Sequence, residues 1–185
     1  GPYASLDAWC KGGHKPCFQD MDTPVSLAGA TAPWLGAREI VTGDTGDTVV
    51  HVAIRTKAGW FVGPPQGDPT DAVGVGSLAL RDVVPGGAPE LVVHYVDDWL
   101  AGRTQMCTDR LAYCGLGASG RPSCTPSLPL REGTCTDPDQ PVEWDWELGI
   151  RYVAGGRVVF APKAGGVALP AYAKKWVATY SLAFP

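Results

Sequence analysis

The segment Glu143–Glu147 (EWDWE) places three carboxylates alternately with two indoles. Carboxylates at such spacing can act as acids, bases, nucleophiles or cation ligands. On a β-strand, successive side chains point to opposite faces, so Glu143, Asp145 and Glu147 would share one face and Trp144 and Trp146 the other. Unpaired carboxylates are costly to bury, whereas indoles bury a large apolar area. We therefore expect the indoles to fill a core and the acids to face water.

A catalytic interpretation is the alternative, because EWDWE is similar to the Glu-x-Asp-x-Glu signature of family 16 glycoside hydrolases, which are β-sandwiches. The resemblance implies that Glu143 is the nucleophile, Asp145 its helper and Glu147 the acid/base. Retaining glycosidases hold their two carboxyl groups about 5–5.5 Å apart. Residues four apart on a regular strand are about 13 Å apart at Cα, so the strand would have to bulge or the side chains lean together. Whether the chain is an enzyme stays open, and a non-catalytic domain is the preferred interpretation.

A cation site is a further alternative for this acidic region. Asp137 and Asp139 precede the motif and are weak candidates for structural calcium, although the usual calcium loop with its central glycine is absent. Cys10, His14 and Cys17 in CKGGHKPC provide three potential zinc ligands, but their spacing matches no common zinc pattern. We assign no metal or cofactor and treat calcium at the aspartates as the open possibility.

The cysteines favour disulfides and an oxidising compartment. They fall along the chain as neighbouring pairs, which makes local pairing the simplest of the 15 connectivities that six cysteines allow: Cys10 with Cys17, Cys107 with Cys114, and Cys124 with Cys135. Disulfides persist outside the cytoplasm, so we expect an extracytoplasmic bacterial protein that is periplasmic, secreted or lipid-anchored at the cell surface. The leading Gly1-Pro2 is what some tag-removing proteases leave, and we expect that an export signal has been removed.

Charge and hydropathy exclude two classes of partner. The net charge is −4, and no basic stripe is present that would neutralise the phosphates of a nucleic acid. No stretch approaches the roughly 20 apolar residues that a membrane-spanning helix needs. The chain holds seven tryptophans, and Trp99, beside Asp97 and Asp98, is the best candidate for an exposed binding residue. Such a residue would suit a glycan or another envelope protein as the partner.

The remaining pattern is that of an all-β protein. Gly and Pro punctuate short apolar runs, which is typical of strands joined by tight turns. We expect one domain over residues 1–185, in which 1–36 forms an irregular N-terminal wrap and 101–140 a cysteine-rich loop region. Helical turns are expected at most at 97–103 or 170–176. The predicted strands cover 38–42, 48–56, 60–63, 77–84, 90–96, 141–153, 157–162 and 175–184. The predicted fold is an antiparallel sandwich or curled meander with long disulfide-stapled loops.

One hairpin also carries a resemblance. The stretch from Leu80 to Val93 (LRDVVPGGAPELVV) resembles a degenerate FG-GAP or VCBS-type repeat of secreted bacterial proteins, with Asp82, Gly87 and Glu90 at the first acidic, glycine and closing acidic places. Val84 and Gly86 stand where that family places calcium carboxylates. Because Ca²⁺ takes six to eight oxygen ligands, the resemblance implies a hairpin and export without bound calcium there.

These patterns together predict an exported, non-catalytic binding or envelope-assembly domain whose ligand the sequence does not identify. A β-sandwich glycoside hydrolase that uses Glu143, Asp145 and Glu147 is the alternative function.

Overall fold

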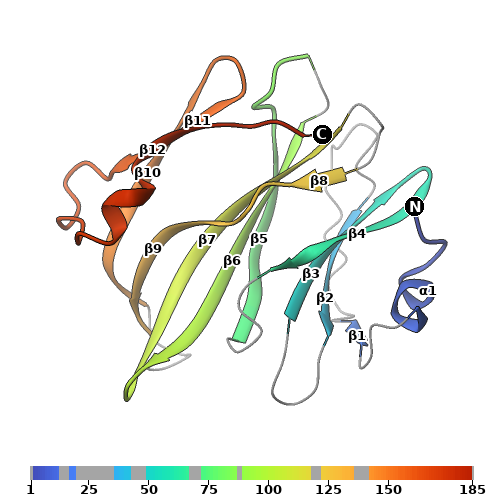
Figure 1. Cartoon of the computed structure of the whole chain (residues 1–185), viewed down its shortest axis with the longest axis horizontal. Helices are drawn as coiled ribbons and strands as arrows, with labels where there is room; N and C mark the ends of the chain where they lie inside the picture. The colour runs from blue at the N-terminus through green and yellow to red at the C-terminus, as the bar shows by residue number, and fades with distance from the viewer. Residues whose placement is uncertain are drawn as a thin grey trace.

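The structure is a computed structural model that describes residues 2–12, 17–19, 36–42, 49–66, 72–86, 89–117, 122–135 and 142–184. Within these ranges the side chains of residues 17–19, 36–42, 49, 50, 52, 64–66, 72–76, 78 and 99 are not described. The described residues form two antiparallel sheets, one short α-helix and one 3₁₀ turn (Figure 1). The all-β antiparallel class predicted from the sequence is therefore confirmed.

The smaller sheet contains four strands in sequence order. They are β1 (Cys17–Gln19), β2 (Gly36–Thr42), β3 (Val49–Thr56) and β4 (Gly59–Gln66). Helix α1 (Leu6–Lys11) packs against this sheet, because its Leu6 and Trp9 form a small buried cluster with Ala53 of β3. The hydroxyl of Ser5 caps the helix by accepting a hydrogen bond from the amide of Ala8 at 3.1 Å.

The larger sheet contains eight strands in the order β12-β11-β10-β9-β7-β6-β5, with β8 paired to the end of β7. Its first half consists of β5 (Ala72–Arg81), β6 (Glu90–Ala101), β7 (Thr104–Leu116), β8 (Pro122–Cys124) and β9 (Leu128–Thr134). Its second half consists of β10 (Glu143–Val153), β11 (Arg157–Pro162) and β12 (Ala178–Ser181). The smaller sheet contacts the larger one where β3 meets β5 and β4 meets β8.

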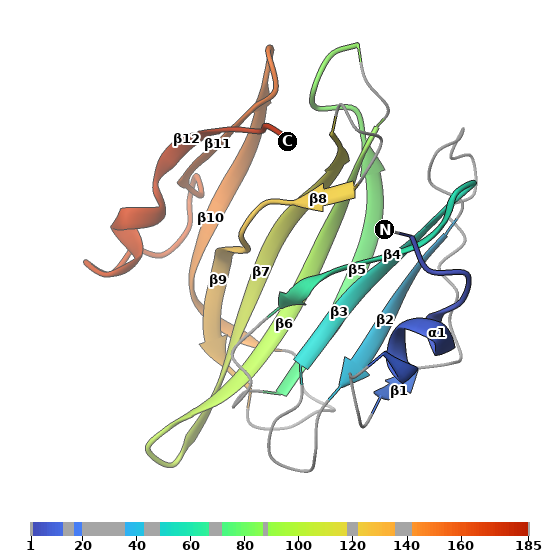
Figure 2. The same cartoon turned by 45° about the vertical axis from the view of Figure 1, so that its right-hand side comes forward.

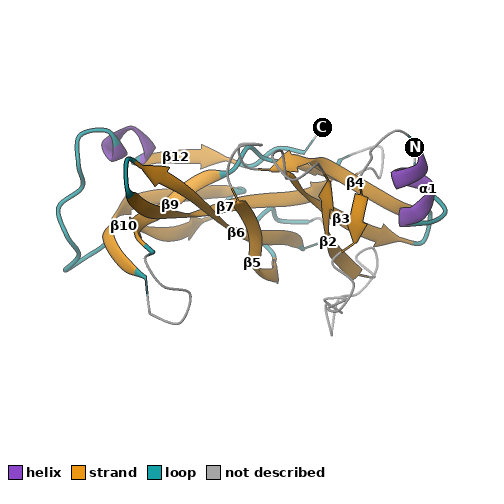
Figure 3. Cartoon of the chain, turned by 90° about the horizontal axis from the view of Figure 1, so that it is seen from below, coloured by secondary structure: helices purple, strands orange, loops and turns teal. Residues whose placement is uncertain are grey.

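Strand β10 joins the two halves of the larger sheet. Its residues Glu143–Glu147 pair with β9, and its residues Leu148–Val153 pair with β11. The chain after β12 then returns to β7, where the ring of Phe184 fills the space that a Cβ on Gly115 would occupy. The larger sheet is therefore rolled: β11 packs against β6 and β7 through buried side chains, and Figures 2 and 3 show the chain after β12 running back toward β7.

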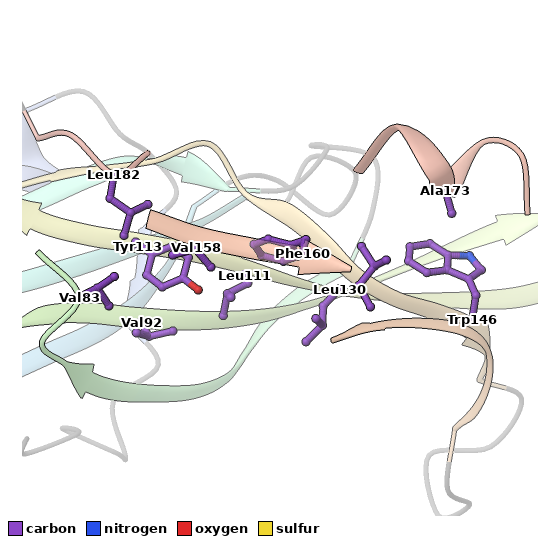
Figure 4. Packing of buried hydrophobic residues seen from close by; sticks show 11 residues of the cluster. Val83, Val92, Leu111, Tyr113, Leu130, Trp146, Val158, Phe160, Ala173 and Leu182 are labelled. Atoms are coloured by element: carbon purple, nitrogen blue, oxygen red, sulfur yellow. The ribbon is translucent and has the colours of Figure 1, made fainter. Parts of the chain in front are cut away.

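The main hydrophobic core lies inside this roll. It takes Val92 and Leu111 from one side and Val158 and Phe160 from the other. Figure 4 shows the cluster extending from Val83 and Leu182 at one end to Trp146 and Ala173 at the other. Burial of these large side chains favours closure of the roll, since each contributes roughly 1.5–3 kcal/mol when it is removed from water.

The cysteine-rich region is the largest departure from the sequence prediction. Residues 101–140 were expected to form a stapled loop, but they contain β7, β8 and β9, and β7 is a central strand of the larger sheet. The long disulfide-stapled loop of the prediction is therefore wrong. The predicted turn of helix at 97–103 is also wrong, because these residues form the end of β6 and its turn into β7.

The predicted pairing of four cysteines is wrong for the same reason. Cys107 and Cys114 lie seven residues apart on one strand, which is roughly 23 Å and far beyond the reach of a disulfide. Cys114 instead bonds to Cys124, its directly opposite residue on β8, with a Cα–Cα distance of 4.0 Å. Cys107 bonds to Cys135, which follows β9. Both bridges therefore link neighbouring strands of one sheet.

The remaining elements follow the sequence more closely. The predicted strands at 38–42, 48–56, 77–84, 90–96, 141–153 and 157–162 correspond to β2, β3, β5, β6, β10 and β11. The expected turn near 170–176 is the 3₁₀ helix η1 (Ala173–Trp176), and the closing strand is confined to β12. The irregular N-terminal wrap over 1–36 contains α1 and β1.

Candidate functional site

The EWDWE segment forms the corner at which β10 leaves β9. Its register shifts between Trp144 and Trp146, which leaves Asp145 as the extra residue of a β-bulge. Glu143 and Asp145 are exposed, whereas Trp146 is 2% exposed and belongs to the main core. The prediction that the indoles pack inward and the acids face water is confirmed for these residues.

A glycine on the neighbouring strand permits this corner. A Cβ on Gly133 would lie 1.9 Å from the carbonyl oxygen of Glu143 and 2.7 Å from the Cα of Trp144. No side chain tolerates such a distance to backbone atoms. The two strands can therefore approach closely at the corner only because residue 133 has no side chain.

Trp144 is half-buried, and a cation covers its ring. The guanidinium of Arg131 lies 4.1 Å from the ring centroid, and its Nε donates a hydrogen bond to Asp109 at 2.8 Å. The second oxygen of Asp109 lies 3.5 Å from Nδ1 of His94. The buried Asp109 carboxylate is thus compensated by the Arg131 guanidinium, as a buried charge requires, while its second oxygen has no hydrogen-bond partner among the described residues.

The hydrolase interpretation depends on Glu143 and Glu147, and Glu147 is engaged elsewhere. Its Oε2 forms an ion pair at 2.6 Å with Nζ of Lys163, the residue that follows β11. None of the three acids Glu143, Asp145 and Glu147 lines the groove described below. No feature of the described residues favours the glycosidase roles, which stay predictions.

The structure describes the side chains of two of the three predicted binding residues on β6. Asp97 is 1% exposed and accepts a hydrogen bond from Nε of Arg110. Asp98 is half-buried and accepts one from the amide of Gln105 at 2.6 Å. The two aspartates point to opposite faces of the strand because they are consecutive residues. The side chain of Trp99 lies outside the described residues.

The tryptophans that the structure describes are not exposed platforms. Trp9 and Trp146 are buried, and Trp60, Trp144 and Trp176 are half-buried. Each of the three half-buried rings is also covered by a cation, from Arg55, Arg131 and Lys175 respectively. Stacking of a sugar on these five rings is therefore not supported.

The metal candidates receive no support from the described part of the chain. Asp137, Asp139 and His14 lie outside the described residues. Cys10 is disulfide-bonded, so its sulfur is not a thiolate ligand for zinc. No group of three or more His, Cys, Asp or Glu side chains is placed to hold a metal ion among the described residues.

The hairpin that resembles an FG-GAP repeat uses its closing acid to bind backbone. Glu90 is buried, and its Oε2 accepts hydrogen bonds from the amides of Val83 at 2.8 Å and Val84 at 3.2 Å. Asp82, at the first acidic place, is exposed. The predicted hairpin exists, with Arg81 paired to Glu90, and this carboxylate closes its loop.

A groove that sequence reasoning did not predict lies along the connection from β11 to β12. Its volume is about 590 Å³, and we call it the 162–177 groove. Two lysines and a set of apolar or small residues line it: Pro162, Lys163, Gly166, Val167, Ala168, Leu169, Lys174 and Val177. Val167 is 65% exposed, and Leu169 packs against the main core, so the groove joins an open rim to a fixed floor.

The loop that forms the groove is fastened to the EWDWE corner. The indole Nε1 of Trp146 donates hydrogen bonds to the hydroxyl of Tyr172 at 2.9 Å and to Oε1 of Glu132 at 3.4 Å. The Tyr172 hydroxyl in turn donates to Glu132. Partial burial and then this hydrogen bond raise the pKa of Tyr172 above its usual value. The neighbouring Ala173 is completely buried, so the loop is held by both packing and hydrogen bonds.

Charge distinguishes this part of the chain from the rest. All 19 aspartates and glutamates precede Leu148, and the segment from 148 to 185 contains five lysines and arginines. The groove therefore lies in a cationic segment of a protein whose net charge is −4. This asymmetry is the sequence signal that could have located the site, since the lining contains no acid, histidine, cysteine or serine.

Comparison with known proteins returns no match, either to a family model, to a curated protein or to a solved structure. The site must therefore be interpreted from its own geometry. Among the described residues, no helix has the length and apolar character needed to cross a membrane.

Proposed function

We propose that this protein is an exported, non-catalytic binding domain whose binding surface is the 162–177 groove. The observation that carries the proposal is the groove itself, which combines aliphatic side chains, two lysines and a loop held in place by Trp146 and Tyr172. Binding sites are typically concave and mostly apolar, with a few polar groups that fix orientation. Because the loop is already ordered by its contacts, a ligand would not have to order it on binding.

The disulfides support the extracytoplasmic part of the proposal. Cys107–Cys135 and Cys114–Cys124 link β7 to its neighbours, and cytosolic reductants would keep these cysteines in the reduced thiol form. The loops that these bridges close contain about 28 and 10 residues. In the chain-entropy model they contribute roughly 3.6 and 2.7 kcal/mol to stability. A fold that depends on this contribution would suit an oxidising compartment.

Chemical-shift mapping tests the proposed surface. The isotopically labelled protein is titrated with a fragment library of acids, bases and neutral compounds, and backbone amide shifts are recorded. We expect the shifts of bound fragments to cluster at Lys163, Val167, Lys174 and Val177. Shifts that cluster elsewhere, or a library without binders at the groove, would overturn the assignment of this surface.

A hydrolysis assay addresses the alternative function. Release of reducing sugar is measured on a panel of polysaccharides for the wild-type protein and for Glu147→Gln. The binding proposal expects no release above buffer from either protein. Release by the wild-type protein that Glu147→Gln abolishes would instead establish the glycosidase roles of EWDWE.

A further inference from the structure

We propose that the ligand of the 162–177 groove is an amphiphilic acid, namely a free carboxylate or phosphate monoester that carries an apolar chain. This inference rests on the proposed function, because it names the chemical class that the same groove would take. It follows from three properties of the lining residues: the sign of their charge, the apolar surface between the charges, and a competing internal anion.

The sign of the charge comes first. The ionisable side chains of the lining are Lys163 and Lys174, and no carboxylate belongs to the lining. Lys174 is exposed, and no ion pair of this residue occurs among the described residues. An ammonium group in such a position attracts an anion without first having to lose an internal partner. The segment from 148 to 185 itself contains no acid.

The apolar surface determines the body of the ligand. Val167, Leu169 and Val177 present aliphatic side chains to the groove, and two of them are exposed to solvent. Exposed aliphatic surface that is concave gains free energy when an apolar chain covers it. A small anion such as acetate would use only the lysines, and a neutral alcohol would use only the aliphatic walls.

The Glu147 carboxylate of the protein itself already forms an ion pair with Lys163. Glu147 lies outside the lining, yet its Oε2 is 2.6 Å from Nζ of Lys163. A bound acid would have to share Lys163 with this carboxylate and would be repelled by its charge. Removal of the Glu147 charge should therefore strengthen binding of an acid.

Calorimetric titration with defined probes tests the inference. The probes are decanoate and decyl phosphate below their micelle concentrations, decanol below its solubility limit, and acetate. We expect both long-chain acids to bind and to weaken as salt is added, since salt screens exposed charges. Decanol and acetate should each bind at least about 10-fold more weakly, because each lacks one of the two interactions.

Variants separate the charges from the fold. Lys174→Gln should weaken decanoate binding by roughly 3- to 10-fold and leave decanol unchanged. Glu147→Gln should tighten decanoate binding by roughly 2- to 5-fold. Lys57→Gln is the matched control, because Lys57 is exposed in the turn between β3 and β4 and should have no effect. Circular dichroism of each variant establishes that the fold is retained.

The outcomes distinguish this inference from the proposed function. If decanol binds as tightly as decanoate, or Lys174→Gln changes nothing, the acidic ligand class is overturned while the groove remains a binding surface. If fragments map to the groove but neither long-chain acid binds, the result is the same. Stronger binding to phosphatidylglycerol vesicles than to monomeric decyl phosphate, measured by co-sedimentation, would overturn a free acid in favour of a membrane headgroup. If no fragment maps to the groove, the proposed function itself fails.

Discussion

Glu90 offers a sharp test of how the β5–β6 hairpin is closed. Its carboxylate accepts hydrogen bonds from two backbone amides, Val83 and Val84, and the side chain is buried. Glu90→Ala would leave both amides without this acceptor in a site with little access to water. A buried amide that loses its partner costs about 1–2 kcal/mol, so the substitution should lower the free energy of unfolding by about 2–4 kcal/mol.

Thermal and urea denaturation, followed by circular dichroism, measure this loss. For a domain of this length, each kcal/mol shifts the melting temperature by about 2–4 °C, which gives an expected decrease of about 4–16 °C. Glu90→Gln keeps a carbonyl acceptor in the same place and should lose only about 1 kcal/mol. Asp82→Ala is the matched control, since Asp82 is an exposed acid of the same loop and its loss should stay within about 0.5 kcal/mol.

Two results would refute the reasoning about Glu90. One is a Glu90→Ala protein whose unfolding free energy lies within about 0.5 kcal/mol of wild type, the range of an ordinary surface substitution. The other is a wild-type melting temperature that rises with calcium, falls with a chelator and loses this dependence in Glu90→Ala. That result would make the carboxylate a metal ligand of the kind that the FG-GAP resemblance associates with this loop.

Three further predictions address the corner, the bridges and a buried hydroxyl. Gly133→Ala should cost about 3 kcal/mol or more because its Cβ meets backbone of β10, whereas Gly149→Ala, whose Cβ would have no neighbour closer than 3.7 Å, should unfold near the wild-type urea midpoint. Replacement of both Cys114 and Cys124 by serine should cost about 2.7 kcal/mol, and non-reducing peptide mapping of wild type should recover these two residues in one bridge. Tyr95 is buried, its hydroxyl has no hydrogen-bond partner among the described residues, and burial followed by the nearby Asp97 charge raises its pKa. Folding therefore favours the neutral form of Tyr95. This contribution to stability is present below the unfolded pKa of about 10 and is lost as the pH rises above it. Urea titrations should therefore show a smaller alkaline loss of stability for Tyr95→Phe than for wild type.

The parts of the fold that could be predicted are those in which local pattern and tertiary environment agree. The run TVVHVAIRT alternates and is β-branched, and it forms β3 next to a glycine turn. The sequence RVVFAP follows a Gly-Gly turn and forms β11 in the same way. In both cases the local sequence alone indicates a strand.

Strand β7 could not be predicted because it is a central strand that buries polar residues. Its middle reads Thr108-Asp109-Arg110, and Thr108 and Asp109 are both buried. Buried charges are stable only with partners, and the partner of Asp109 is Arg131, 22 residues away. The local sequence of β7 therefore indicates a polar loop with cysteines. The same long-range pairing determines the disulfides, since the choice of Cys124 for Cys114 follows from strand neighbours and not from spacing.

The groove was missed for a different reason. A search for residues that could perform chemistry leads to EWDWE, whereas the lining of the groove consists of lysines, glycine, proline and aliphatic residues in an irregular segment. Such residues define a site only when the loop between β11 and β12 has a fixed shape. That shape depends on hydrogen bonds of Tyr172 with β9 and β10, and the sequence of residues 162–177 alone does not indicate them.

The two features are nevertheless connected through one residue. Trp146 was expected to be a core indole, and it is, but its Nε1 also holds Tyr172 and thereby the loop that forms the groove. The bulge at Asp145 sets where Trp146 enters the core, and Gly133 permits that bulge by its lack of a side chain. On the outer side, Glu147 controls how much of the Lys163 charge the groove can offer. The segment that most resembled an active site in the sequence thus affects the groove in two ways. The Trp146 indole fixes the shape of its loop, and the Glu147 carboxylate partly neutralises the positive charge of Lys163.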